Sequence, residues 1–251
     1  MRLGTPLLGF CVLGLIALSS GAAAIDGVFP GKIQFKVRKG VLLTGSFHLS
    51  FEEDLNAVDG DRYQITLSKF EGLGFTSDQQ LISSIFIEDL ALFGHLVLAG
   101  DGAKVSEVYL DTDCRSAIGQ KKTRCFKYRE GPASDPIQTE IFAPYKAIDL
   151  ISSIVVASQA GGDEDFKEED YNFIFNKATK QVTLVDAGSE EIETPAGKQK
   201  ATVLVLKHKN SGVELYRFYV GKGARGAYPL KMLFTDANGG QIEFIAEDVT
   251  W

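Results

Sequence analysis

The sequence predicts a mainly β domain of the α+β class, with a strongly curved antiparallel sheet or open barrel wrapped around one or two apolar helices. Three observations lead to this prediction. Most of the chain alternates apolar and polar residues with period two, which is typical of half-buried strands. Turn-forming pairs such as Asp59-Gly60 and Asp101-Gly102 separate these runs. Two segments instead carry apolar residues at helical spacing, and we expect the sheet to cover them.

The first 24 residues are predicted to be a secretory signal peptide. Arg2 gives a positive start, residues 6–19 are almost wholly apolar, and Ala22-Ala23-Ala24 offers small side chains for cleavage after Ala24. The apolar run is shorter than the ~20 residues of a bilayer-spanning helix, so we expect no transmembrane segment in the mature chain. The predicted organisation is a signal peptide, 1–24, and a single mainly-β periplasmic domain, 25–251. Secretion from the cell is the alternative location.

The strands follow from the period-two runs. They are predicted, in order, at residues 33–37, 46–51, 63–67, 105–110, 125–129, 171–175, 181–185, 202–208, 213–220, 230–234 and 241–246. Because short connections join the last four runs, we predict that they form an antiparallel meander.

The first predicted helix lies between Gln79 and Phe93. Ser77 and Gln80 have the spacing of a capping box. One face of this helix would carry Ile82, Ile85, Phe86, Leu90 and Phe93.

The second predicted helix lies between Pro144 and Ser158. Proline suits the first turn of a helix, and Asp149 is expected to cap it or to bond a nearby backbone amide. One face would carry Ala147, Ile151, Ile154 and Val155. The following acidic stretch, Gly161–Asp170, is predicted to be a solvated loop.

The cysteines predict one disulfide. Cys11 leaves with the signal peptide, and bulky Phe10 before it argues against a lipoprotein. Cys114 and Cys125 remain as an even pair in an exported protein, for which a bridge worth roughly 3 kcal/mol is expected. The alternative, a redox or metal pair, would need C-x-x-C spacing or a second pair of ligands.

Composition and motifs exclude several classes of function. A formal net charge of −7 argues against a nucleic-acid partner, because phosphates require a basic face. Gly221, Gly223 and Gly226 spell G-x-G-x-x-G, but a strand-like run follows where a dinucleotide site needs a helix. We predict a hairpin connection there.

No catalytic residue, metal site or cofactor is predicted. The histidines, His48, His95 and His208, are far apart in the sequence and lie in or beside strand-like runs, where single histidines are usually structural. Distant residues can still meet in space, which the sequence alone leaves open.

Several short motifs occur in an order that resembles the DUF3108-type domain of exported bacterial proteins. They are Leu43-Thr44-Gly45-Ser46-Phe47, Asp61-Arg62-Tyr63-Gln64-Ile65 with Glu71-Gly72-Leu73, Ile148-Asp149-Leu150-Ile151-Ser152-Ser153, Glu193-Thr194-Pro195-Ala196-Gly197 and Tyr228-Pro229-Leu230-Lys231. The cysteine pair and the acidic stretch depart from this pattern. The resemblance implies a periplasmic, mainly β domain, and it carries no catalytic residues.

Two functions are favoured for the mature domain over a third, an enzyme, for which the sequence shows no recognisable nucleophile, acid–base pair or metal cluster. The first is a non-enzymatic structural or protein-interaction module of the cell envelope, whose partner is an envelope protein. The alternative is a periplasmic carrier that binds a lipophilic small molecule inside the curved sheet. The walls of such a cavity are predicted to include Phe47, Phe51, Phe86, Leu90, Ile151 and Phe173.

Overall fold

The computed structural model describes residues 31–40, 42–53, 62–68, 80–86, 88–111, 124–132, 135–175, 177–223, 225–235 and 240–251. The predicted signal peptide, Ser77 and Cys114 lie outside these residues, so the predictions that depend on them stay predictions.

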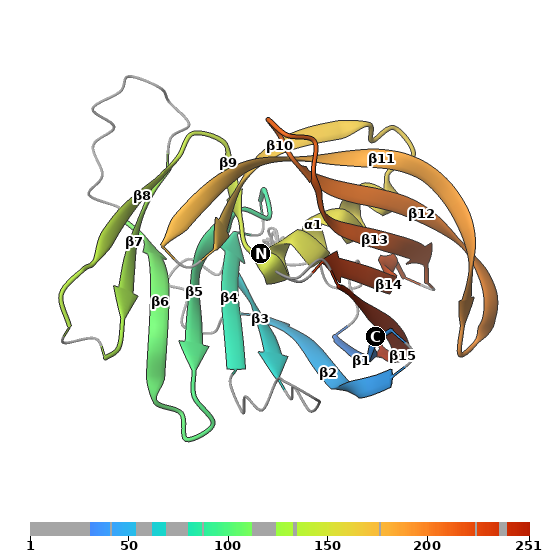
Figure 1. The fold of residues 1–251 in the computed structure, drawn as a ribbon, viewed down its shortest axis with the longest axis horizontal. Coiled ribbons are helices and arrows are strands. Elements are labelled where there is room, and N and C mark those ends of the chain that lie inside the picture. Colours follow the sequence, from blue (N-terminus) through green and yellow to red (C-terminus); the bar gives the residue numbers. More distant parts are fainter. Residues whose placement is uncertain are drawn as a thin grey trace, which may run out of the picture.

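The described chain forms one sheet and one helix (Figure 1). The strands of the first half are β1 (Lys32–Lys39), β2 (Leu42–Glu53), β3 (Arg62–Ser68), β4 (Gln80–Phe86), β5 (Leu92–Leu98), β6 (Lys104–Leu110), β7 (Arg124–Glu130) and β8 (Thr139–Ala143). After them come β9 (Lys146–Ile148), α1 (Leu150–Gly162), β10 (Glu168–Phe175), β11 (Ala178–Thr194), β12 (Gly197–His208), β13 (Glu214–Lys222), β14 (Ala227–Thr235) and β15 (Gln241–Thr250).

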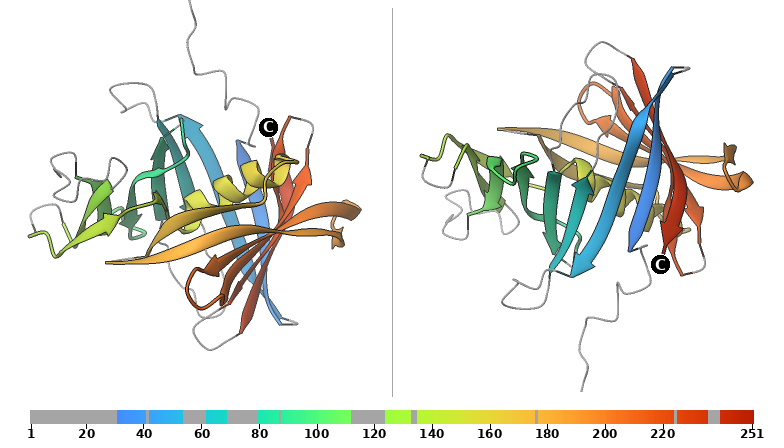
Figure 2. Two further views of the ribbon diagram at one scale, coloured as in Figure 1. Left: turned by 90° about the horizontal axis from the view of Figure 1, so that it is seen from above. Right: turned by 90° about the horizontal axis from the view of Figure 1, so that it is seen from below.

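All 15 strands belong to a single sheet, in the order β8-β7-β6-β5-β4-β3-β2-β1-β15-β14-β13-β12-β11-β10-β9. Neighbours are antiparallel except β9 and β10, which are parallel. The two halves of the chain join where β1 pairs with β15, for example through Phe35 opposite Ala246. The sheet curls around α1 into a nearly closed barrel (Figure 2). The predicted fold class is confirmed, with one helix among the described residues.

Each predicted strand overlaps a strand of the structure, and the predicted C-terminal meander is confirmed as β12-β13-β14-β15. Alternation of burial explains the agreement. In β1, Ile33, Phe35 and Val37 point into the barrel, while the residues between them are more exposed. The pairing of β11 with β12 shifts register between Asp186 and Ser189, and such a bulge bends a strand. Gly188 at this bulge has a φ of +97°, a conformation that favours glycine.

The helix predicted between Gln79 and Phe93 is wrong. That segment forms β4, a tight turn and β5 instead. The turn places Leu90 in the left-handed region with a φ of 54°, and the Leu90 amide donates to the Phe86 carbonyl at 2.9 Å. The apolar residues that suggested a helical face therefore lie on both faces of a strand pair.

The second predicted helix is confirmed with shifted bounds. Residues 146–148 form β9, so Ala147 lies on a strand, and α1 begins at Leu150 and continues to Gly162. The predicted acidic loop is correspondingly shorter than expected, because α1 covers its start and β10 begins at Glu168.

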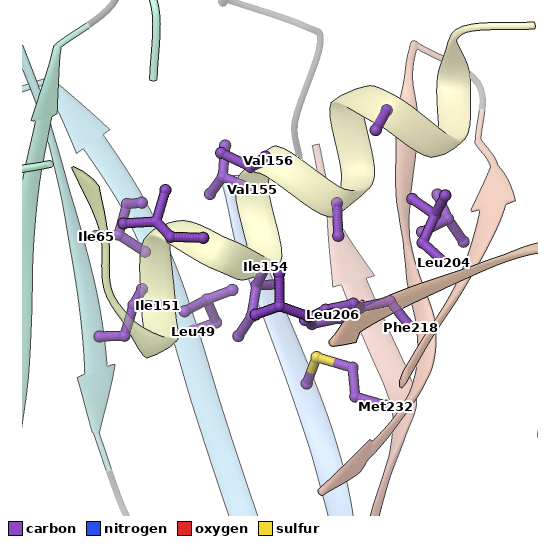
Figure 3. Packing of buried hydrophobic residues seen from close by; sticks show 14 of the residues in the cluster. Leu49, Ile65, Ile151, Ile154, Val155, Val156, Leu204, Leu206, Phe218 and Met232 are labelled. Carbon is purple, nitrogen blue, oxygen red and sulfur yellow. The ribbon is translucent and has the colours of Figure 1, made fainter. Parts of the chain in front are cut away.

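Helix α1 fills the barrel. Ten of its 13 residues are buried, and they surround the helix on all sides rather than forming one stripe. Figure 3 shows Ile151 and Ile154 beside Leu49 of β2 and Leu206 of β12. The main apolar cluster thus joins strands from both halves of the chain through the helix.

Two smaller clusters lie outside this main core. One joins the β5–β8 strands to Ala147 of β9 and Ile174 of β10, so that β9 and β10 are covered on both faces. The other packs Ile192 of β11 with Val203 and Tyr219 on the outer face of the C-terminal strands.

Candidate functional site: the barrel interior and the β8 edge

Helix α1 begins at a buried acidic residue, Asp149. Its Oδ1 atom accepts a hydrogen bond from the Ser152 backbone amide at 2.8 Å, and the Asp149 amide donates to the Ser152 hydroxyl at 2.7 Å. This reciprocal pair is a capping box, which satisfies two amides that a helix N-terminus leaves without partners. The predicted capping role of Asp149 is confirmed.

The same carboxylate connects α1 to the N-terminal half of the sheet. The Ser83 hydroxyl on β4 donates a hydrogen bond to Asp149 Oδ2. His95 Nδ1 on β5 lies 3.3 Å from that oxygen, close enough for an ion pair, but the angle does not meet the criterion for a hydrogen bond. Ser83 and His95 are opposite each other in the β4–β5 ladder. All three side chains are buried, and we call Ser83, His95 and Asp149 the Asp149 clamp.

The electrostatics of the Asp149 clamp favour a charged carboxylate. Burial disfavours the charge and would by itself raise the pKa of Asp149. The contacts with His95, the Ser83 hydroxyl and the Ser152 amide outweigh that effect and hold the pKa below its ordinary value. Asp149 is therefore ionised inside the barrel at neutral pH. Burial, together with this charge, raises the pKa of Tyr216 to about 12.

Serine, histidine and aspartate also form the triad of many hydrolases, but the connections here are different. In a triad the histidine lies between the other two and takes the serine proton. In the Asp149 clamp the aspartate lies between the others, and the Ser83 proton points to the carboxylate. Ser83 is also completely buried. This arrangement positions a helix and does not activate a nucleophile.

Four of the six predicted cavity residues meet in the main apolar cluster. Phe47, Leu90, Ile151 and Phe173 are buried members of it, and Phe51 is half-buried against it. These five side chains therefore belong to, or pack against, the apolar cluster around α1, and their role as walls of a ligand cavity stays a prediction.

Phe86 does not join them. Its ring packs edge-on against Phe93, with the centroids 5.4 Å apart, and the Arg124 guanidinium lies 4.8 Å from it. Arg124 also pairs with Asp89 at 2.9 Å. Phe86 therefore belongs to a separate contact at the start of the β4–β5 turn.

The glycine motif is a hairpin connection, as predicted. Gly221 lies in β13, and the Gly223 amide donates to the Gly226 carbonyl at 2.7 Å before β14 begins at Ala227. His48 and His208 lie on β2 and β12. His208 Nδ1 accepts a hydrogen bond from the nearby Ser211 amide at 3.4 Å. The partners of His95 were missed because Ser83 and Asp149 are distant from it in the sequence.

A cavity of about 380 Å³ lies on the outer face of the sheet, between β11 and the faces of β13, β14, β15 and β1. Its lining is acidic on balance, with the basic residues Arg38 and Lys231 beside four glutamates at positions 190, 191, 193 and 243. Lys231 pairs with Glu243 and lies 5.4 Å from the Tyr219 ring, and Arg217 Nη1 approaches Glu190 Oε1 at 3.9 Å. This cavity is polar and separate from the predicted apolar interior.

Three exposed apolar side chains lie on β8 and its flanks, at the other end of the sheet. Ile137, Phe142 and Tyr145 are 42%, 50% and 36% exposed. Phe142 lies on β8, the terminal strand among those described, while Ile141 and Ala143 point into the cluster below. Tyr145 contacts Lys209, whose Nζ donates to its hydroxyl at 3.3 Å. We call residues 137–145 the β8 edge, and an edge strand with an exposed aromatic ring is a candidate interaction surface.

The structure leaves the predicted disulfide untested. Cys125 is 4% exposed on β7, and Cys114 lies outside the described residues. Within the described part of the chain, no three His, Cys, Asp or Glu side chains are grouped to hold a metal ion. In the same part, no helix is long and apolar enough to span a bilayer.

Comparison with protein-family models finds no match, so the likeness to the DUF3108-type domain remains a resemblance. No curated protein matches the sequence either. Two solved structures are similar over most of the chain. One is a candidate exported protein with a YmcC-like fold from Bacteroides fragilis, with 10% identity and a TM-score of 0.31, covering 89% of this chain and 99% of the other. The second is a DUF1329 family protein from Desulfovibrio piger, with 9% identity and a TM-score of 0.30, covering 90% of this chain and 88% of the other. Because both TM-scores are low, no property of either protein is transferred to this chain.

Proposed function

We propose that the protein is an exported, non-enzymatic interaction module of the cell envelope, which binds a protein partner at the β8 edge. Export rests on the charge, apolar run and small residues of positions 1–24. The single observation that carries the binding role is the half-exposed Phe142 ring on the terminal strand of the sheet.

The filled interior supports this function over one that depends on an internal site. Side chains of α1 occupy the middle of the barrel, and the polar groups found there serve to hold the helix. The β8 edge has the opposite character, because it combines apolar side chains with a strand that pairs on one side only among the strands that the structure describes. An edge strand offers free backbone donors and acceptors, and partner strands commonly add to such edges.

Site-specific photo-crosslinking in the producing cells tests the proposal. A photoreactive phenylalanine analogue at position 142 should give a discrete protein adduct. The matched control is the same analogue at Val213, which is 58% exposed but lies far along the chain from β8. Absence of an adduct at position 142, or the same adducts at both positions, would overturn the proposed role of the β8 edge.

A second function, carriage of a lipophilic ligand in the interior, is favoured by the apolar character of α1. If the helix withdrew, the side chains of Phe47, Leu90 and Phe173 would line an apolar space. Native mass spectrometry of protein purified from its own cells tests this alternative. A co-purifying mass of lipid size that is lost in Phe47→Asp would support it, whereas an apo mass alone would count against it.

A further inference from the structure

The β8 edge is open to strand addition. β8 pairs with β7 through five register positions, from Tyr128 opposite Thr139 to Arg124 opposite Ala143. On its other side, no strand of the described chain pairs with it. Figures 1 and 2 place β7 and β8 at the periphery of the molecule, away from the helix.

Little within β8 would prevent such pairing. Edge strands are commonly protected by lysines, by prolines or by inward-pointing charges. β8 has the sequence Thr-Glu-Ile-Phe-Ala, without lysine or proline, and its inward residues are Ile141 and Ala143. Pro136 and Pro144 flank the strand and limit the length of any added pairing to the segment between them.

A two-fold axis at Ile141 gives the simplest register for pairing with a second copy. In that antiparallel pair, Glu140 of one copy lies opposite Phe142 of the other. The two Phe142 rings are diagonal neighbours on one face, within the reach of aromatic side chains. Phe142, which is 50% exposed, thus gains an apolar neighbour across the axis. Tyr145 lies beyond Pro144, and its hydroxyl accepts a hydrogen bond from Lys209 of the same chain at 3.3 Å.

The charges also permit this register. Glu140 is the only charged residue of β8, and Lys127 lies opposite it on β7 within the same chain. The pairing sets no two like charges directly opposite each other, an arrangement that would be destabilising. Two-fold pairing of one surface with itself is also the commonest form of homo-oligomer.

We infer that two copies of this chain associate through antiparallel β8–β8 pairing centred on Ile141, which continues the sheet across a two-fold axis. This inference rests on the proposed function, since it names the partner of the β8 edge. The contact is confined to one short strand and its flanks, so the dimer is expected to dissociate on dilution, as small interfaces do.

Sedimentation velocity of the purified protein over a range of concentrations tests the inference. The wild type should shift from the monomer mass to twice that mass as the concentration rises. Phe142→Glu should remain monomeric at concentrations where the wild type is dimeric, because each new carboxylate would lie directly opposite Glu140 of the other copy, and like charges in that arrangement are destabilising. Val213→Glu is the matched control and should behave as the wild type does. Phe142→Ala, which only removes the ring, provides a second variant and should shift dimerisation to higher concentration.

Hydrogen exchange provides the positional test. Amides of residues 139–143 should become more protected as the wild type dimerises, and those of β13 should not change. A wild type that stays monomeric at every concentration would overturn self-pairing, as would a dimer unaffected by Phe142→Glu and Phe142→Ala. A monomeric protein that still crosslinks to a different protein from position 142 would refute self-pairing and leave the proposed interaction module standing.

Discussion

Asp149 is the residue on which the position of α1 depends most directly. A buried carboxylate is costly unless it is paired and hydrogen-bonded. Here one oxygen caps the helix through Ser152, and the other meets Ser83 and His95 on the sheet. The charge is therefore stabilised only when the helix N-terminus lies against β4 and β5, which gives α1 a specific depth in an otherwise apolar barrel.

Asp149→Asn is predicted to destabilise the protein by about 2 kcal/mol at neutral pH, because hydrogen bonds to a buried charge are worth roughly that much. Asparagine is as good a cap as aspartate, so the helix start itself should survive. Asp163→Asn, at the exposed C-terminal end of α1, is the matched control and should change stability by less than about 0.5 kcal/mol. Urea unfolding measures both. Equal stabilities of the two variants would contradict the role of the Asp149 charge.

The contribution of Asp149 should also depend on pH in a definite direction. Its pKa is lower in the folded protein than in the unfolded chain, where a value of about 3.9 is ordinary. The stabilisation is then fully present above about pH 4 and is lost as the pH falls through the folded value. The difference in unfolding free energy between wild type and Asp149→Asn should be constant from pH 7 to about pH 4 and shrink below that. A difference that grows on acidification would refute this assignment.

At the scale of single elements, β4 shows where sequence reasoning failed. Its inward positions are Leu81, Ser83 and Ile85, which is a regular period-two face with a serine at its centre. The serine is buried because it bonds to Asp149, and that partner is 66 positions away. A local pattern cannot contain this information. With Ser83 counted as exposed, the remaining apolar residues fit helical spacing better than a strand.

Most strands of the C-terminal half and β1 were predicted correctly because their buried positions are apolar. β6 and β10 each bury one polar side chain, Ser106 and Asn172, but the apolar residues around them are numerous enough to predict a strand. Their burial follows from the residues themselves and needs no distant polar partner. The two ends of α1 were predicted less well for a related reason. Pro144 and Ala147 are compatible with a helix start, but parallel pairing of Lys146–Ile148 with β10 takes this segment into the sheet. The gathering of exposed apolar residues at the β8 edge could be suspected only after β8 was known to be terminal.

The contact between α1 and the sheet leads to a prediction about Gly161. A Cβ atom there would lie 2.6 Å from Val220 Cβ on β13. Replacement of a helical glycine by alanine normally stabilises by up to about 1 kcal/mol. Because the helix cannot move away without losing burial along its length, Gly161→Ala is predicted instead to destabilise by about 1–3 kcal/mol.

The double variant Gly161→Ala/Val220→Gly separates the crowding from other effects. Val220→Gly removes the Cβ atom and both methyl groups that a Cβ on residue 161 would meet, so the cost of Gly161→Ala should be smaller in the Val220→Gly background than in the wild type. Thermal or urea unfolding of the four proteins measures this coupling. Additive effects would show that the helix–strand contact is not the cause.

At the scale of the whole molecule, the sheet has no internal break at which the chain could divide. The N-terminal half runs from β8 to β1, and the C-terminal half from β15 to β9, and they are joined by the β1–β15 ladder from Lys32 to Lys39. Helix α1 contacts β3 and β4 on one side and β12, β13 and β14 on the other. The sequence predicts 11 of the 15 strands and their antiparallel arrangement. The closing of the sheet around α1 depends on long-range pairing, such as that of β1 with β15, which no local pattern specifies.

The described domain is predicted to unfold in one transition, although two-state behaviour is usual only for domains under about 150 residues. Loss of either half would expose α1 and the main apolar cluster, so neither half should persist alone. The single tryptophan, Trp251, packs edge-on against Tyr228 with centroids 5.9 Å apart and reports on the C-terminal half. Far-UV circular dichroism reports on all strands. The two unfolding curves should coincide in urea, and the calorimetric enthalpy should equal the van't Hoff enthalpy. A circular dichroism transition that precedes the Trp251 change would instead show that β3–β8 unfold independently, and the chain would then consist of two separable units joined at β1.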